Sequence, residues 1–167
     1  MKKKFEKQKG FTLIELVIYM GIFCLLMVVM LQLLTAIFDV QLESQSTSAV
    51  SQDGRFILNR LTYDINNSIN VISPTIGNQG TSLVISDGNV TYTYQLLNGN
   101  LTLTNNITGT KDQLNSVNTS LSNLNFLTLS DTSAQNKTVT MSFTINSKVI
   151  RREGINTENF RITLGTR

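Results

Sequence analysis

The chain has 167 residues, of which 41% are hydrophobic, and a formal net charge of +3. That length allows one compact domain plus an anchor. Five lysines and one glutamate give residues 1–10 a charge of +4, whereas the remaining 157 residues carry nine basic and ten acidic side chains. The basic excess therefore does not predict nucleic-acid binding by the folded part. With no histidine and a single cysteine, Cys24, an intrachain disulfide and a Cys/His metal site are excluded.

An uncharged apolar run of 23 residues extends from Leu16 to Phe38. About 20 such residues cross the hydrocarbon layer of a bilayer as a helix. The lysines before the run predict a cytoplasmic N-terminus and an exported C-terminal part. A cleaved secretory signal is the alternative. It fits poorly, because its apolar region usually has about 7–15 residues and because Thr35-Ala36-Ile37 offers no small-residue cleavage site.

A helical pattern continues in weaker form after Phe38, first through the polar segment 39–51. Apolar residues then recur at helical spacing at Phe56, Ile57, Leu61, Ile65 and Ile69. The polar residues Arg55, Asn59, Arg60 and Asp64 fall on other faces. The pattern predicts one helix from about residue 11 to 66, and its poorest helix propensity, near 44–54, is where a bend would fall.

Beyond the helix, Pro74, Gly77 and Gly80 predict a loop, after which apolar and polar residues alternate. The alternation predicts strands at 90–96, 101–103, 138–145 and 160–164, and Asn98-Gly99 predicts a tight hairpin turn. The polar segment 105–122 is typical of an exposed loop, and a change of phase between Phe126 and Leu127 indicates a bulge. A sheet that is apolar on one face needs a cover, which the helical stripe supplies. The fold class predicted is α+β, with a long N-terminal helix packed on an antiparallel sheet.

Residues 9–16 read Lys-Gly-Phe-Thr-Leu-Ile-Glu-Leu. A basic leader that ends in glycine, followed by this aromatic and acidic pattern and an apolar helix, resembles the N-terminus of type IV prepilins and type II secretion pseudopilins. The resemblance implies that a membrane peptidase cuts between Gly10 and Phe11 and that Phe11 is then N-methylated. It implies a leader over 1–10, a transmembrane and assembly half of the helix over 11–38, and an exported pilin-like domain over 39–167.

Glu15 lies at the head of the apolar run, where its charge is costly. An acidic residue at mid-bilayer costs about 2.5–3.5 kcal/mol on insertion scales. Cleavage would create a cation, the amine of Phe11, with an unperturbed pKa of about 7.7–8.0. Glu15 of one subunit could meet that amine of a neighbour, and we expect Glu15 and Thr12 to form the assembly site. Taken alone, Glu15 could instead be an interfacial residue whose side chain reaches the headgroups.

Three further segments, at 55–68, 90–104 and 121–129, are similar to W-type minor pilins and J-type pseudopilins. They match a helix end, a Tyr-x-Leu hairpin and a later Leu-x-Phe strand of those proteins. The chain departs from them in two features. Thr102 stands where they often carry arginine, and there is no C-terminal disulfide loop.

The resemblance implies a structural subunit of a pilus, a secretion pseudopilus or a DNA-uptake filament, and leaves these three open. The implied partners are prepilin peptidase, other pilins or pseudopilins, and an inner-membrane assembly platform. No cofactor, metal or catalytic residue is expected. The implied location is the cell membrane, crossed once, before assembly, and a surface or envelope filament afterwards.

Two other classes of function are weaker alternatives. An anchored enzyme would need a Ser/Lys pair or two carboxylates among Asp64, Asp87, Asp112 and Asp131, whose contexts are those of a helix face, a turn and loops. Calcium binding would need a D-x-D-x-D-G pattern, which the sequence lacks. An anchored adhesin would share the topology but would not need Gly10 and Glu15.

Overall fold

The long N-terminal helix is continuous. The structure, a computed structural model, describes residues 10–130 and 137–166, so the predicted leader lies outside the described residues except for Gly10. Helix α1 runs from Leu13 to Asn66, close to the predicted 11–66, and continues without interruption through 44–54. The chain divides into two compact units, Met1–Gln41 and Leu42–Arg167, and each contains a part of α1.

In the first unit, α1 is apolar on every side. Its large apolar side chains from Leu13 to Val40 are 48–83% exposed. In the part of the chain that the structure describes, α1 is the one helix long and apolar enough to cross a membrane. A helix that exposes apolar side chains all round is typical of a membrane span.

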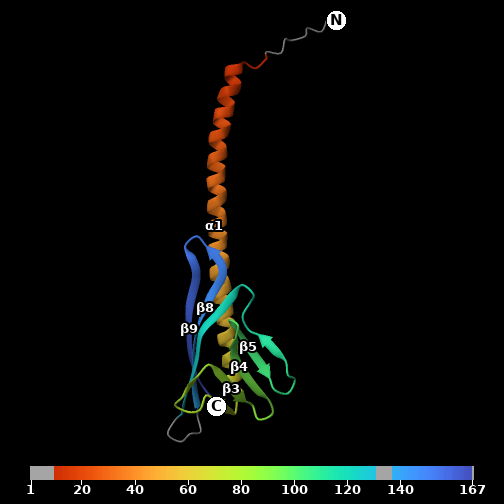
Figure 1. The fold of residues 1–167 in the computed structure, drawn as a ribbon, viewed down its shortest axis with the longest axis vertical. Helices are drawn as coiled ribbons and strands as arrows, with labels where there is room; N and C mark the ends of the chain where they lie inside the picture. Colours follow the sequence, from red (N-terminus) through yellow and green to blue (C-terminus); the bar gives the residue numbers. More distant parts are fainter. Residues whose placement is uncertain (1–9, 131–136, 167) are drawn as a thin grey trace. The chain divides into compact units, whose positions relative to one another are not determined.

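The second unit contains the last part of α1 and two antiparallel sheets (Figure 1). The strands in the described ranges are β1 (Asn70–Ser73), β2 (Gln79–Gly80), β3 (Ser82–Ser86), β4 (Thr91–Leu97), β5 (Asn100–Asn105), β6 (Lys111–Gln113), β7 (Thr119–Ser130), β8 (Lys137–Arg151) and β9 (Gly154–Gly165). One sheet has the order β1-β3-β4-β5-β6 and the other β2-β7-β8-β9. The α+β prediction is confirmed, with two sheets in place of the single sheet expected.

The strongest local patterns gave the right elements. Strands β4 and β5 form the predicted hairpin, and both residues of its turn have positive φ, 51° at Asn98 and 77° at Gly99. Such φ values define the turn type that Asn-Gly favours. Strands β8 and β9 are longer than predicted, because the polar residues near their hairpin, from Lys148 to Asn159, obscure the alternation.

Two predictions about the sheets were wrong, and two strands were missed. The segment 105–122 is not all loop, since it contains β6 and the first residues of β7, and Leu114 and Asn115 are buried. The bulge in β7 lies between Ser122 and Asn125, at Asn123 with φ 53°, rather than beside Phe126. Strands β1 and β3 were not predicted, although they supply the buried residues Val71, Leu83 and Ile85. Their shortness left little alternation to detect.

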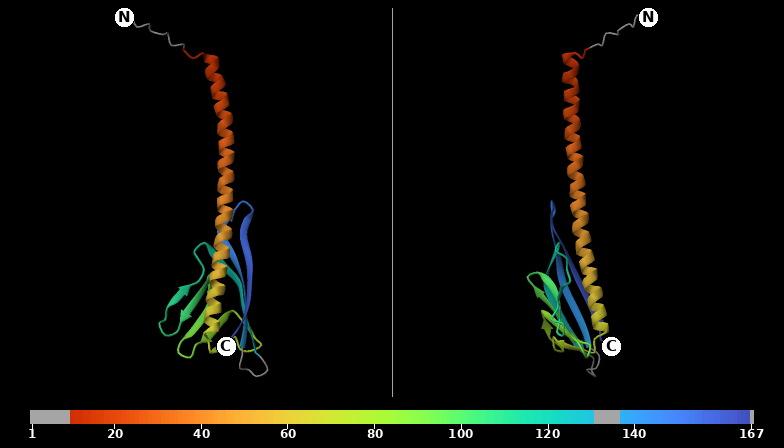
Figure 2. Two further views of the ribbon diagram at one scale, coloured as in Figure 1. Left: turned by 180° about the vertical axis from the view of Figure 1, so that it is seen from behind. Right: turned by 90° about the vertical axis from the view of Figure 1, so that its right-hand side faces the viewer.

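The core lies between the last part of α1 and the inward faces of both sheets (Figure 2). From the helix, Val50, Ile57, Leu61 and Ile65 are fully buried. From the sheets, the most buried residues are Leu83, Ile85, Tyr94, Leu101, Phe126, Val139, Met141 and Ile145. Each buried aliphatic side chain contributes about 1.5–3 kcal/mol relative to exposure.

The predicted apolar stripe of the helix needs correction at both ends. Phe56 is 54% exposed, because it lies one position away from the buried face. Ile69 is 70% exposed and follows the end of α1. Asp64, predicted to be on a polar face, is buried.

Polar contacts also attach α1 to the sheets. The Asp53 carboxylate accepts hydrogen bonds from the Ser116 backbone N–H at 2.8 Å and from the Thr119 hydroxyl at 2.5 Å. Nearer the start of the second unit, Arg151 of β8 forms an ion pair with Glu43 at 2.5 Å. Each contact joins α1 to a residue far along the chain, so together they define how the sheets lie along the helix.

Gly54 allows β9 to approach α1 closely. A Cβ placed on Gly54 would lie 2.2 Å from the ring of Phe160. That ring stacks on Phe143 with a centroid distance of 5.3 Å. The glycine in the poorest helical segment is therefore required by packing between the helix and the sheet.

We expect Gly54→Ala to lower the free energy of unfolding of the second unit. Overpacking costs about 1–3 kcal/mol, whereas the better helix propensity of alanine returns about 1 kcal/mol. In a Phe160→Ala background the ring is absent, so Gly54→Ala should raise the free energy of unfolding of the second unit. Urea titration of the four variants measures both effects, and stabilisation by Gly54→Ala in both backgrounds would show that Phe160 does not require the glycine.

We expect a chain that begins at Val40 to fold as a soluble monomer, since the core described above lies in the second unit. Circular dichroism should show helix and strand with a cooperative thermal transition, and sedimentation should give the monomer mass. Aggregation or disorder would show that the sheets need a partner, for example at the open edge of β9.

Candidate processing and assembly site

The bond between Gly10 and Phe11 lies just before α1. Both residues are exposed and precede the first helical residue, Leu13. Around Gly10, a built Cβ has no neighbouring atom within 4 Å. A residue outside regular structure with no side chain can enter a protease cleft in an extended conformation. The expected cleavage between Gly10 and Phe11 stays a prediction.

Glu15 and Thr12 together cap the start of α1. The Thr12 hydroxyl accepts a hydrogen bond from the Glu15 backbone N–H at 3.4 Å, and the Glu15 carboxylate accepts one from the Thr12 backbone N–H at 3.5 Å. This reciprocal pattern is a capping box, which satisfies two of the unpaired N–H groups at a helix start. Both distances are at the long end for hydrogen bonds. The spacing T-x-x-E at 12–15 could have revealed this arrangement, but the sequence reasoning missed it.

Two aromatic side chains also meet in the first turns of α1. The rings of Phe11 and Tyr19 meet edge to face with centroids 6.1 Å apart. Because consecutive residues are about 3.8 Å apart, the backbone nitrogen of Phe11 lies no more than about 7 Å from the Glu15 carboxylate that contacts Thr12. The structure thus brings Phe11, Thr12 and Glu15 together at one helix end.

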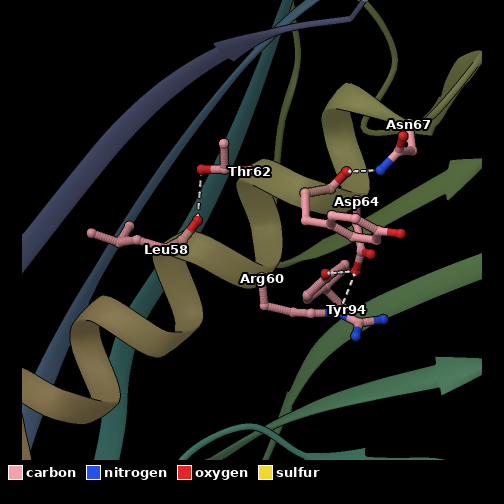
Figure 3. A network of polar contacts seen from close by, with 7 residues as sticks. Leu58, Arg60, Thr62, Asp64, Asn67 and Tyr94 are labelled. Carbon is pink, nitrogen blue, oxygen red and sulfur yellow. Dashed lines mark hydrogen bonds and ion pairs between the residues drawn. The ribbon is translucent and has the colours of Figure 1, made fainter.

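A second constellation lies in the core, where Asp64 joins α1 to β4 (Figure 3). The Asp64 carboxylate accepts a very short hydrogen bond from the Tyr94 hydroxyl and an ion-paired one from Arg60 Nε at 2.9 Å. Burial, and then the charge of Asp64, raise the pKa of Tyr94 well above its usual value. Burial alone would lower the pKa of Arg60, but the hydrogen bond and charge of Asp64 outweigh it and raise that pKa. The two donors therefore stay protonated and hold the carboxylate.

Of the carboxylates considered for an enzyme, the three that the structure describes have the contacts of structural groups. Asp64 and Asp87 line one small cavity of about 100 Å³, whereas Asp112 lies on the exposed β6 and Asp131 lies outside the described residues. Hydrogen bonds from the backbone N–H groups of Val90 and Asn89 lower the pKa of Asp87. A general acid at neutral pH needs a raised pKa. The arrangement is that of a structural ion pair and a turn.

The comparisons with known proteins agree with the N-terminal geometry. Residues 6–31 match the family model described as the prokaryotic N-terminal methylation motif. This motif is the type IV prepilin signal, and it covers the exposed bond, the capping box and the first turns of α1. No curated protein and no solved structure matches the chain.

We expect the stability of the second unit to fall above pH 10, the ordinary pKa of tyrosine. Tyr94 then stays protonated in the folded state while it loses its proton in the unfolded state, so the folded state binds more protons and stability decreases as pH rises. One proton gives a slope of about 1.4 kcal/mol per pH unit.

Denaturant titration between pH 8 and 11 measures this slope for wild type, Tyr94→Phe and Tyr63→Phe. Tyr94→Phe should lose the steep decline and destabilise at neutral pH by about 1–3 kcal/mol, since Asp64 loses a buried donor. Tyr63, which is 65% exposed, is the matched control and should keep the decline. Equal slopes in all three proteins would contradict the role of Tyr94.

Proposed function

We propose that this chain, which carries a type IV prepilin signal, is a structural subunit, a minor pilin or pseudopilin, of a pilus, secretion or DNA-uptake filament. One observation carries the proposal. The methylation motif at 6–31 coincides with an exposed Gly10-Phe11 bond followed by a helix that is apolar on every side. Such a helix needs lipid or other apolar helices around it.

The proposed sequence of events follows from these parts. Prepilin peptidase removes residues 1–10 on the cytoplasmic side, and Phe11 is N-methylated. Residues 11–38 hold the subunit in the inner membrane, with residues 39–167 exported. An assembly platform then moves the subunit into a filament, where the helices of other pilins replace lipid around α1. The same apolar surface thus serves as membrane anchor and as subunit interface.

Glu15 has two roles in this proposal. Within its own chain it caps α1 through Thr12. Between subunits, its charge pairs with the amine of a neighbour's Phe11 in an apolar surrounding, where removal of one partner costs on the order of 3–5 kcal/mol. Capping needs only an acceptor, but pairing with an amine needs the negative charge.

Within this class, we place the chain nearest to the W-type minor pilins and J-type pseudopilins. The supporting residues are the segments at 55–68, 90–104 and 121–129. In the structure these segments are the end of α1, the β4–β5 hairpin and part of β7. All three contribute to the core around Asp64 and Tyr94 or to the sheet beside it.

We expect the mature protein to begin at Phe11 with a methylated amine. Mass spectrometry of the protein purified from cells with an active prepilin peptidase measures the terminus directly. Gly10→Ala places a Cβ at the scissile position and should leave most of the protein unprocessed, whereas Gly21→Ala, in the middle of the span, should be processed normally. An intact Met1 terminus in the wild-type protein would overturn the proposed processing.

We expect Glu15→Ala and Glu15→Gln to be inserted and processed but to fail in assembly. Glutamine can replace glutamate in a capping box, so Glu15→Gln keeps the cap and removes the charge. Loss of a few kilocalories per mole lowers association a few hundredfold or more, by about tenfold for each 1.4 kcal/mol. Co-purification of processed protein with its pilin-like partners measures association.

Thr12→Ala is the complementary variant, because it weakens the cap and keeps the charge. It should assemble much better than either Glu15 variant. If Glu15→Gln assembles normally while Glu15→Ala and Thr12→Ala both fail, capping is the function of Glu15 and the charge pairing is wrong.

A further inference from the structure

The hairpin between β8 and β9 ends in an exposed apolar pair. Ile150 of β8 lies directly opposite Ile155 of β9, across the turn that joins Arg151 to Gly154. Ile150 is 78% exposed and Ile155 is 59% exposed. Residues directly opposite in an antiparallel pair lie on the same face of the sheet. The tip therefore presents one apolar patch, made of these two side chains.

The hairpin points toward the N-terminal side of α1 within the second unit. Three contacts follow one another along the helix: Phe160 against Gly54, Glu158 with Ser51 at 3.5 Å, and Arg151 with Glu43 at 2.5 Å. As β9 is followed back toward the turn, its partners on α1 therefore come earlier in the sequence. Figure 2 shows this hairpin beside α1 in both views. The tip lies at or before the level of Glu43.

Glu43 is close in sequence to the membrane-spanning segment. It follows Phe38, the last residue of the apolar run, by five positions. Five residues of helix rise about 7.5 Å, and even a fully extended chain of that length spans no more than about 18 Å. The headgroup layer on each side of a bilayer is about 5–8 Å thick. Glu43, and with it the tip residue Arg151 that it binds, therefore stays within about 18 Å of the end of the apolar run, whatever path the chain takes.

We propose that the hairpin tip docks on the membrane that holds α1, with Ile150 and Ile155 inserted into the headgroup layer. This inference rests on the membrane anchoring in the proposed function. Two isoleucines add too little area to hold a protein on a membrane alone, but an anchored domain needs only a contact that fixes its orientation.

The charges around the patch fit a lipid surface. The segment 148–155 contains Lys148, Arg151 and Arg152 against the single acid Glu153. Arg151 is held by Glu43, which fixes the tip to the helix. The long side chain of Lys148 can reach lipid phosphates while its stem lies along apolar groups. Basic residues next to a membrane are attracted by anionic lipids.

The absence of tryptophan in this chain allows a direct test. Single tryptophans are placed in the full chain by Ile150→Trp, by Val117→Trp and by Phe38→Trp, and each protein is reconstituted in vesicles of phosphatidylcholine and phosphatidylglycerol. Val117 is the matched control, since it is also 78% exposed but lies beside Ser116, which binds Asp53. The tryptophan of Phe38→Trp reports whether the end of the membrane-spanning segment lies in the bilayer. Emission is compared in vesicles with and without brominated phosphatidylcholine, which quenches tryptophan only within the bilayer.

We expect brominated lipid to quench Ile150→Trp and Phe38→Trp strongly and Val117→Trp hardly at all. If only Phe38→Trp is quenched, the anchor stands and the docking of the tip is wrong. If none of the three is quenched, the membrane anchoring itself fails. A blue-shifted but unquenched Ile150→Trp would show that protein rather than lipid covers the patch, which also overturns the proposal. Ile155→Trp repeats the test at the second position of the pair.

Discussion

Burial of one face of α1 between Ser46 and Ile65 is the constraint on which the second unit depends. The helix supplies a fully buried row, including Ile57 and Leu61, and both sheets turn their apolar faces to it. An apolar row alone would let the sheets slide along the helix, because the hydrophobic effect is non-directional. The carboxylates of Glu43, Asp53 and Asp64 fix the position of the sheets along the helix. Each of them binds a residue that belongs to the sheets or to the loop beside them.

The N-terminal part of α1 differs, because no described residue of its own unit buries it. Its apolar side chains remain exposed. The polar groups at its start form hydrogen bonds with each other, in the Thr12–Glu15 capping box. In lipid an unpaired backbone N–H costs several kilocalories per mole. Glu15 thus caps its own helix and, in the proposed filament, also pairs with the positively charged Phe11 amine of a neighbouring subunit.

Local patterns predicted most of the fold, and distant partners explain most of what they missed. The helical period predicted both ends of α1 to within two residues, and Asn98-Gly99 predicted the β4–β5 hairpin. Both features depend on residues that are neighbours in the sequence. Asp64 looked like a surface charge, because its partner Tyr94 lies 30 residues away. Strand β6, made of Lys111, Asp112 and Gln113, has no apolar alternation and exists through pairing with β5 alone. At the candidate site, Gly10, Phe11 and Glu15 were singled out by the resemblance to prepilins, whereas the capping role of Thr12 was missed although the T-x-x-E spacing could have revealed it.

The contacts of β8 and β9 with α1 have a consequence for the order of events during export. Glu43 and Ser51 meet residues that lie 108 and 107 positions later in the chain. Pairings of such separation form late, because a long loop must close first. In the proposed topology, β8 and β9 cannot close on the helix until Arg151 and Glu158 have crossed the membrane. The contacts of β8 and β9 with α1 therefore form late in translocation, after the more local pairings such as the β4–β5 hairpin.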